Sequence, residues 1–507
     1  MIFFWIKKNR LEFSLLFAIL LLAAFFRFYQ LPEYMQFLGD QGRDAIIIKQ
    51  ILIDHHFPAI GPPSSVGTVY LGPLYYYMMA AVMGTFWLSP VAAAGMIALI
   101  GVAAVFLIYY LAKEWFGPKA GLATGFLYAI SPVMINYSRF SWNPNPVPFF
   151  TLLAFLGIYK AHKTGNFFWF ILTAVSLAAV LQLHYLTLTL LPIFGLLWLN
   201  ELRRYLLKKS EIQNFYPGTT LGIFLFFFLM SPLAFFDLRH GFMNFHGLVN
   251  LFTGKNSGVS LSLAGSFSRL PDVFINSFLG RYLAGQNTYL AGVVGLLIFI
   301  PIIRRWYLYS KTRHMSWVFL ALSLWLIVGF LGLMFYKGPI YDHYLLFLSP
   351  IPFILLGALA ELDLDLRGFN YFKIAVMGII LVILTFANLT INPLLSPPNK
   401  QLQKTQTIDQ FIIEQTRSKP FNFALLAENN YDSAYQFYLD QMGHKPLHVP
   451  ENKTDQLFVV CEDQFCKPIG NSKYEIAAFG WTKLEWEKEV SGVKVFKLVP
   501  NPQQVNR

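Results

Sequence analysis

The sequence predicts an α-helical polytopic membrane protein of about eleven transmembrane helices, followed by a small C-terminal α/β domain. Of its 507 residues, 56% are hydrophobic and only 13% are charged, whereas soluble domains carry about 25% charged residues. Apolar stretches close to the ~20 residues of a transmembrane helix recur along the first 395 positions. Short basic clusters between them are typical of cytoplasmic loops, so the net charge of +12 does not indicate a nucleic-acid partner.

The first apolar run resembles a signal peptide but lacks a small-residue cleavage site, so we interpret it as a retained span. A stretch too long for one helix is interrupted at Gln182, His184 and Tyr185 and predicts a tight helical pair. The eleven predicted spans cover residues 11–27, 90–112, 119–136, 146–162, 167–199 (two helices), 217–235, 286–303, 316–335, 343–360 and 372–390.

Residues 73–89 are apolar as well, but we predict that they lie along the outer interface without crossing. If they crossed, the basic loops 201–211 and 304–314 would lie outside, against the positive-inside rule. Residues 28–89 then form a first outer loop with amphipathic interfacial helices. Three further outer segments follow, at residues 136–146, 236–285 and 336–343.

Residues 400–507 are predicted to form a small exoplasmic α/β domain after a proline-rich linker. Alternating stretches such as FNFALLAE, DQLFVVCE and VKVFKLV predict strands, and QKTQTIDQFIIEQT and YDSAYQFYLDQM predict helices. The chain's two cysteines, Cys461 and Cys466, lie in this domain. Because an exoplasmic location is oxidising, we expect them to form a disulfide that is structural and remote from catalysis.

The first outer loop contains FLGDQGRDAIIIKQILIDHH, which begins at Phe37. Its pattern predicts a helix with Asp40, Arg43 and Asp44 on one face and an apolar stripe on another. Two interpretations remain open for Asp40: it caps a surface helix that rests on lipid, or it belongs to a functional site. Gly39 and Gly42 favour a site, because glycine would let the backbone approach a substrate closely.

The other outer segments carry further candidates, and each also has a purely structural explanation, such as a prolyl turn, a lipid-headgroup anchor or a packing residue. Because the predicted topology places them all on one side, their acids and cations together suit a reaction on a lipid phosphate. These candidates are Arg139, Asn143 and Asn145 around Trp142, then Arg239 and His240, and finally Lys337 and His343.

The motifs GDQGRDA, GPLYYY and YDHYLLFLSP resemble those of the GT-C glycosyltransferases, in matching order along residues 1–390. That superfamily includes protein O-mannosyltransferases, lipid A aminoarabinose transferases and bacterial undecaprenyl-phosphate-sugar-dependent enzymes. The resemblance implies a GT-C-like transmembrane glycosyltransferase domain over residues 1–395. Two departures are Gln41, where the family usually has Glu, and the asparagines of WNPNP, where it often has a second acid. Because divalent ions favour carboxylates, the asparagines argue against a metal requirement, and the cofactor, a divalent metal or none, stays open.

The resemblance implies transfer of a sugar, with inversion, from a polyprenyl-phosphate monosaccharide to an acceptor hydroxyl on a lipid, glycan or protein. The reaction would take place on the exoplasmic face of the plasma membrane, among membrane lipids. Asp40 would be the catalytic base. The alternative functions are a lipid-linked-sugar flippase or transporter, for which ionisable residues near the membrane midplane would be expected, and a non-catalytic scaffold or receptor.

Three sets of residues would assist Asp40. The orienting residues would be Arg43, Asp44 and Gln41. The residues that bind the donor phosphate, whose negative charge grows as it departs, would be Arg239, His343, Arg139 and Lys337. The acceptor and sugar pocket would be lined by Asn143, Asn145, Tyr75 and His240.

Overall fold

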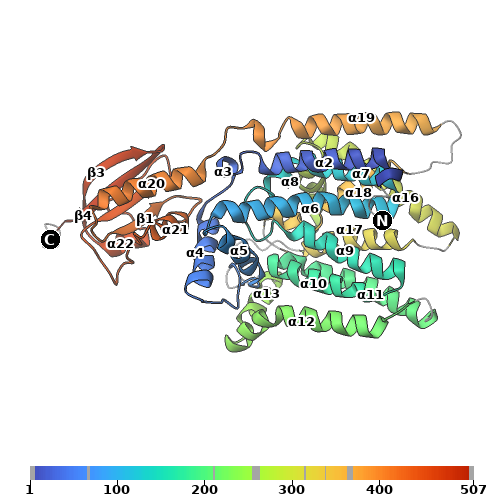
Figure 1. Cartoon of the computed structure of the whole chain (residues 1–507), viewed down its shortest axis with the longest axis horizontal. Helices are drawn as coiled ribbons and strands as arrows, with labels where there is room; N and C mark the ends of the chain where they lie inside the picture. Colours follow the sequence, from blue (N-terminus) through green and yellow to red (C-terminus); the bar gives the residue numbers. More distant parts are fainter. Residues whose placement is uncertain are drawn as a thin grey trace.

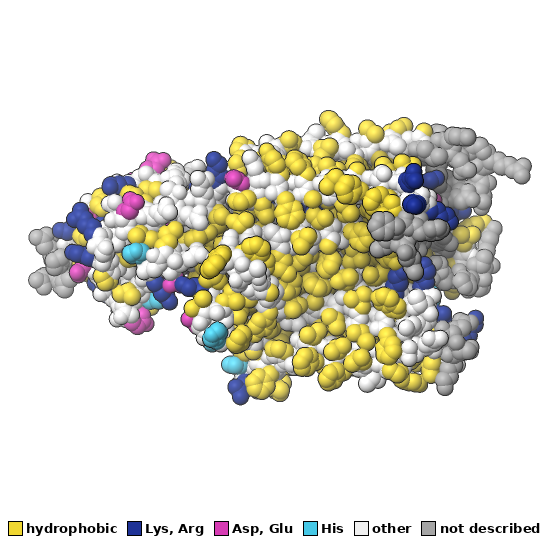
Figure 2. Space-filling model, viewed as in Figure 1, with side chains coloured by type: hydrophobic (Ala, Val, Ile, Leu, Met, Phe, Trp, Pro, Cys, Tyr) yellow, Lys and Arg dark blue, Asp and Glu magenta, His cyan; other side chains and the backbone are white. Residues whose placement is uncertain are grey.

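The molecule is a long helical bundle that carries a small sheet-containing domain at one end (Figure 1). The structure is a computed structural model that describes residues 6–64, 69–208, 212–253, 263–312, 316–336, 339–361 and 369–501. We name the end of the bundle that carries the C-terminal domain the domain end, and the opposite end, where α2 begins, the N-terminal end. The flank between the two ends is largely hydrophobic, and charged side chains gather beyond it (Figure 2).

Each of the eleven predicted spans overlaps a helix of the bundle. Six helical segments of the described chain are long and apolar enough to cross a membrane, and shorter apolar helices pack among them. The bundle helices are α2 (Arg10–Phe28), α6 (Pro90–Phe116), α7 (Pro118–Ile130), α9 (Val147–Thr164), α10 (Trp169–Leu183), α11 (Leu190–Leu207), α12 (Phe215–Arg239), α16 (Thr288–Thr312), α17 (Trp317–Met334), α18 (Pro350–Ala358) and α19 (Phe369–Leu389).

Short elements join these helices. At the domain end, α10 and α11 are separated by an extended His184 and by η1 (Tyr185–Thr189), so the predicted interruption of this stretch is confirmed. The other connecting elements are α3 (Leu31–Tyr34), α8 (Pro132–Asn136), α13 (Met243–Thr253), α14 (Leu263–Ser268), α15 (Leu270–Asp272), η3 (Val273–Gly280), η4 (Asp342–Leu345) and η5 (Pro393–Leu395).

The first loop contributes two helices that lie across the domain end, α4 (Gly39–Ile53) and α5 (Leu74–Thr85). The twelve-residue α5 is not among the described helices that are long and apolar enough to cross a membrane, but neither are the bundle helices α7, α10 and α18. That residues 73–89 do not cross therefore stays a prediction. Tyr75 and Tyr76 are nevertheless buried instead of facing a lipid interface, because α5 packs beneath α4 and against the bundle.

The basic segments at the ends of α11 and α16 lie at the N-terminal end of the bundle, opposite the C-terminal domain (Figure 1). This arrangement agrees with the predicted parity, in which the loops at 201–211 and 304–314 share one side. The last residues of each loop, 209–211 and 313–314, lie outside the described residues.

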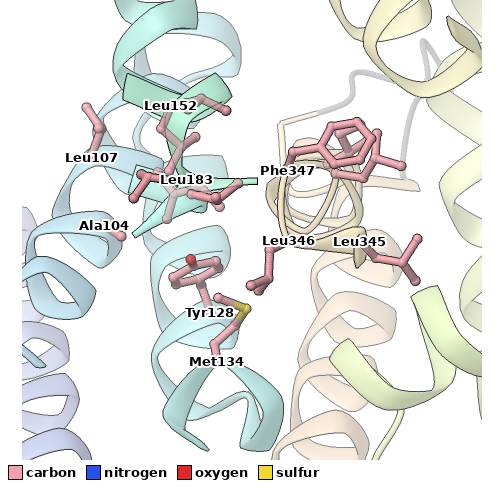
Figure 3. Close-up of a cluster of buried hydrophobic side chains, with 14 of the residues drawn as sticks. Ala104, Leu107, Tyr128, Met134, Leu152, Leu183, Leu345, Leu346 and Phe347 are labelled. Carbon is pink, nitrogen blue, oxygen red and sulfur yellow. The ribbon is translucent and has the colours of Figure 1, made fainter. Parts of the chain in front are cut away.

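The segment between α17 and α18, which contains the last outer loop, is anchored by buried side chains. The predicted span 343–360 starts later than expected, since α18 begins at Pro350 and η4 precedes it as a separate element. Leu345, Leu346 and Phe347 are all buried. Leu346 points toward Tyr128 of α7 and Met134 of α8, whereas Leu345 and Phe347 lie on the other side of their segment (Figure 3). Their burial fixes the position of the preceding His343 at the domain end.

The C-terminal domain has a four-stranded sheet in the order β1-β2-β4-β3, with β1 and β2 parallel and the other pairs antiparallel. Both β1 and β2 are buried along their whole length, because apolar clusters cover the two faces of the sheet. The elements are α20 (Gln401–Thr416), β1 (Asn422–Leu426), α21 (Ser433–Gln441), β2 (Leu457–Cys461), α22 (Tyr474–Phe479), β3 (Thr482–Val490) and β4 (Val493–Pro500).

The predicted strands and helices of this domain are present, and β3 is an additional strand that the alternation rule did not indicate. Cys461 and Cys466 form a disulfide, as expected.

Candidate active site

A cavity of about 660 Å³ lies at the domain end, between the bundle and the C-terminal domain. Such a volume is typical of small-molecule sites. Its walls come from five separate parts of the chain, which the fold brings together. The lining residues are Asp40, Arg43, Pro63, Ser64, Leu71, Trp142, Asn143, Pro144, His184, Tyr185, Tyr341, His343, Tyr344 and Tyr431.

Helix α4 supplies the acid and the cation of this cavity. The N-cap of α4 is Leu38, and its backbone N–H donates to Gln41 Oε1 at 3.0 Å. The side chain of Gln41 therefore satisfies the backbone N–H of the N-cap residue. Asp40 lies in the first turn, and its carboxylate accepts a hydrogen bond from Arg43. The interpretation of Asp40 as a simple helix cap does not hold, because other groups satisfy the helix start.

Arg43 forms ion pairs with both acids on its face of α4, Asp40 and Asp44. Its guanidinium lies 2.9 Å from Asp40 Oδ1 and 2.7 Å from Asp44 Oδ1. Asp44 is almost fully buried and Asp40 is partly exposed to the cavity. Burial raises the pKa of Asp44 to about 6, against the opposing effect of Arg43. Among the described residues that line the cavity, Arg43 is the one lysine or arginine.

The opposite wall is aromatic and uncharged. His343 lies with its ring centroid 4.6 Å from that of Trp142 and 5.8 Å from that of His184. Burial lowers the pKa of His343 to about 4, although the charge of Asp40 acts in the opposite direction. The imidazole is therefore neutral near pH 7, so it does not supply the positive charge that we expected of it. Asn143 donates to the carbonyl of Leu183 at 2.8 Å, which ties this wall to the end of α10.

Several candidates from the sequence lie away from the cavity lining. Arg139 is buried and donates to the carbonyls of Phe26 and Tyr29 at 2.6 and 2.7 Å, so it joins α2 to the second loop. Arg239 and His240 are exposed at the end of α12. The contacts of Arg139 therefore give it a structural explanation, and Arg239 and His240 lie outside the cavity lining.

Tyr75 and Asn145 are also outside the lining and are buried. The Tyr75 hydroxyl hydrogen-bonds to Ser141 Oγ at 2.5 Å, and Asn145 donates to the carbonyl of Phe140 at 2.8 Å. Both residues thereby shape the loop that carries Trp142 and Asn143. Lys337 lies outside the described residues.

The cavity also contains residues that the sequence reasoning did not assign to a site. His184 and Tyr185 were noted for breaking an apolar stretch, and that break is the signal that could have marked them. Tyr341 stood beside a candidate in the last loop. Tyr431 belongs to a different domain, and we find no local pattern that would have connected it with Asp40.

The described residues do not fit a metal ion. No group of three His, Cys, Asp or Glu side chains gathers anywhere in the described part of the chain. The two acids of the cavity region, Asp40 and Asp44, are both engaged by Arg43. We therefore derive no step through a metal.

Comparison with known proteins agrees with the fold. The sequence model of the family described as dolichyl-phosphate-mannose-protein mannosyltransferase matches residues 71–235. No curated protein matches the chain by sequence.

Among solved structures, ArnT from Cupriavidus metallidurans bound to undecaprenyl phosphate is similar, with a TM-score of 0.56 and 14% identity over 97% of this chain and 98% of that one. The Archaeoglobus fulgidus oligosaccharyltransferase in complex with Zn and sulfate is similar with a TM-score of 0.50 and 15% identity, over 88% of this chain and 67% of that one. The same enzyme tethered to an acceptor peptide gives a TM-score of 0.51 and 13% identity, over 92% and 62%.

These findings confirm the resemblance to the GT-C superfamily. The chain has the GT-C fold, with a helical membrane domain and a small C-terminal sheet domain. The family model covers residues 71–235, and the solved structures, all under 25% identical, show the fold that this chain shares with them.

Proposed function

We propose that the protein transfers a sugar from a polyprenyl-phosphate monosaccharide to an acceptor hydroxyl on the outer face of the plasma membrane, with inversion at the anomeric carbon. The observation that carries the proposal is the composition of the cavity: one partly exposed carboxylate, one guanidinium and an aromatic wall, at the end of an apolar bundle. A lipid phosphate at headgroup depth would reach this position while its chain remained in the membrane.

In the proposed reaction, Asp40 removes the proton of the acceptor hydroxyl as that oxygen attacks the anomeric carbon. The bond from this carbon to the phosphate oxygen breaks, and its electron pair stays with the departing polyprenyl phosphate. Arg43 balances the growing negative charge, and neutral His343 offers a hydrogen bond. Asp44 holds Arg43 from its buried side, and Gln41 fixes the first turn of α4. Asn143 and the aromatic side chains form the sugar pocket.

Two similarities support the donor class. The similar ArnT structure holds undecaprenyl phosphate, and the matched family is described by a dolichyl-phosphate-linked sugar. The disulfide of the C-terminal domain is of a kind that persists in oxidising compartments, which supports an exoplasmic active site.

The test is a panel of radiolabelled undecaprenyl-phosphate sugars, both hexoses and aminopentoses, given to the purified protein with lipid, glycan and protein acceptor fractions. We expect label to move to one acceptor fraction. Movement of the intact lipid-linked sugar across vesicles, without transfer in any combination, would refute the proposal and support the flippase alternative.

A further inference from the structure

The C-terminal domain reaches into the cavity through the loop before α21. Gly39 and Gly42 of α4 make this approach possible. A Cβ atom at position 39 would lie 2.5 Å from the ring of Tyr431, and one at position 42 would lie 2.2 Å from the backbone nitrogen of Ala434. We expected these glycines to admit a substrate, and the structure corrects that expectation: they admit the C-terminal domain.

A hydrogen bond and an ion pair connect the C-terminal domain to α4 at the two ends of this helix. The backbone N–H of Gly39 donates to Asn430 Oδ1 at 2.8 Å, which satisfies one of the open donors at the helix start. Near the other end of α4, Lys49 pairs with Asp440 of α21 at 2.7 Å. The loop between these contacts is therefore held at both sides.

Within this loop, Tyr431 contacts the proposed base directly. Its hydroxyl donates to Asp40 Oδ1, and Arg43 donates both to Asp40 Oδ1 at 2.9 Å and to the Tyr431 oxygen at 3.2 Å. Burial raises the pKa of Tyr431 above its ordinary value, so the hydroxyl keeps its proton and acts as a donor. In the described structure both hydrogen bonds to Asp40 end on Oδ1, which leaves Oδ2 for the acceptor.

The position of Tyr431 is itself fixed by the sheet. The side-chain amide of Asn430 donates to both carboxylate oxygens of Glu462, at 3.2 and 2.9 Å, and the hydroxyl of Tyr435 donates to the same carboxylate at 2.6 Å. Glu462 follows β2 and lies inside the loop closed by Cys461 and Cys466. The disulfide is thus linked to the cavity by a short series of hydrogen bonds, and not remote from it as we expected.

We propose that Tyr431 is a positioning residue of the transfer reaction, and that the C-terminal domain completes the active site by bringing its hydroxyl to Asp40. The hydroxyl and Arg43 hold Oδ1, so that Oδ2 faces the acceptor and takes its proton, while Tyr431 keeps its own proton throughout. This proposal rests on the proposed function, in which Asp40 is the base.

The first test is Tyr431→Phe, which removes the hydroxyl but keeps the ring that fills the space beside Gly39. We expect kcat to fall roughly 10- to 100-fold, the factor for a lost hydrogen bond to a charged group. The KM for the panel donor with the highest turnover and the Kd for undecaprenyl phosphate should stay unchanged. The matched control is Tyr474→Phe, an exposed tyrosine of the same domain, which should leave all three quantities at the wild-type value.

The second test combines Tyr431→Phe with Asp40→Asn. If the hydroxyl acts through the carboxylate, its removal should reduce kcat only slightly once Asp40 has been replaced. The losses of kcat in the two single variants should therefore not add in the double variant. Equal losses in both backgrounds, or a KM that rises with the fall in kcat, would show a merely structural role and overturn the proposal. Wild-type turnover by Tyr431→Phe beside an impaired Asp40→Asn would overturn it and leave the proposed function intact. Wild-type turnover by Asp40→Asn would instead refute the proposed function.

Discussion

A single methyl group at position 42 should separate the C-terminal domain from the active site. In Gly42→Ala the new Cβ would lie 2.2 Å from Ala434 N and 2.4 Å from Ser433 C, whereas ordinary contact begins at 3.4 Å. Both neighbours are backbone atoms and cannot rotate away, so α21 must move from α4 by roughly 1 Å. A displacement of this size can cost about 10²-fold in rate, and we expect a loss of that order in kcat.

The assay is turnover of the preferred donor in detergent, with binding of undecaprenyl phosphate measured beside it. Alanine is favoured over glycine by about 1 kcal/mol within a helix, so helix propensity alone would stabilise α4. The matched control is Gly95→Ala in α6, where a Cβ meets nothing within 4 Å, and it should keep wild-type turnover. If Gly42→Ala is as active as this control, then close docking of the C-terminal domain on α4 is not needed for catalysis.

Three further outcomes are expected. Asp40→Asn keeps the shape of the side chain but removes the base, so transfer should fall by about 10²–10⁴-fold with normal donor binding; wild-type turnover would contradict the assignment. Because burial raises the pKa of Asp44 to about 6, the folded protein takes up this proton at a higher pH than the unfolded chain. Its contribution to stability should therefore grow as the pH falls from about 7 to about 5, and the apparent Tm should show this gain relative to Asp44→Asn; parallel curves would contradict it. Finally, a cysteine at Lys208 should escape membrane-impermeant thiol reagents in intact cells, and labelling there would refute the topology.

Much of the membrane architecture could be predicted from the sequence. Helices in a bilayer satisfy their own backbone hydrogen bonds, so apolar length alone indicates where they lie. The parity of the basic loops then predicts that residues 73–89 stay on one side of the membrane, and their helix α5 lies at the domain end. The start of α18 was wrong by seven residues, because Leu345 to Phe347 are buried by the core without being α-helical, and hydropathy does not distinguish a buried segment of this kind from an α-helix.

The candidate site was predictable where its residues share one local pattern. Asp40, Arg43 and Asp44 lie at i,i+3 and i,i+4 spacing, and the structure pairs them across the same helix face. Local spacing does not predict which distant groups the side chain of an arginine contacts. Arg139 and Arg239 have the same charge as Arg43, yet one is tied to the carbonyls of α2 and the other is exposed beyond the cavity.

What the sequence by itself determined is therefore the fold class, the gathering of the basic segments at one end of the bundle and the acid–arginine cluster of α4, because each depends on composition or on spacing within a few turns. Only the tertiary structure decided which outer residues meet in one cavity. It also joined Tyr431 to Asp40 across 391 positions, a contact that depends on two glycines leaving room for a distant domain. Local periodicity carries no information about such a contact, since it arises from how two separately folded surfaces fit together.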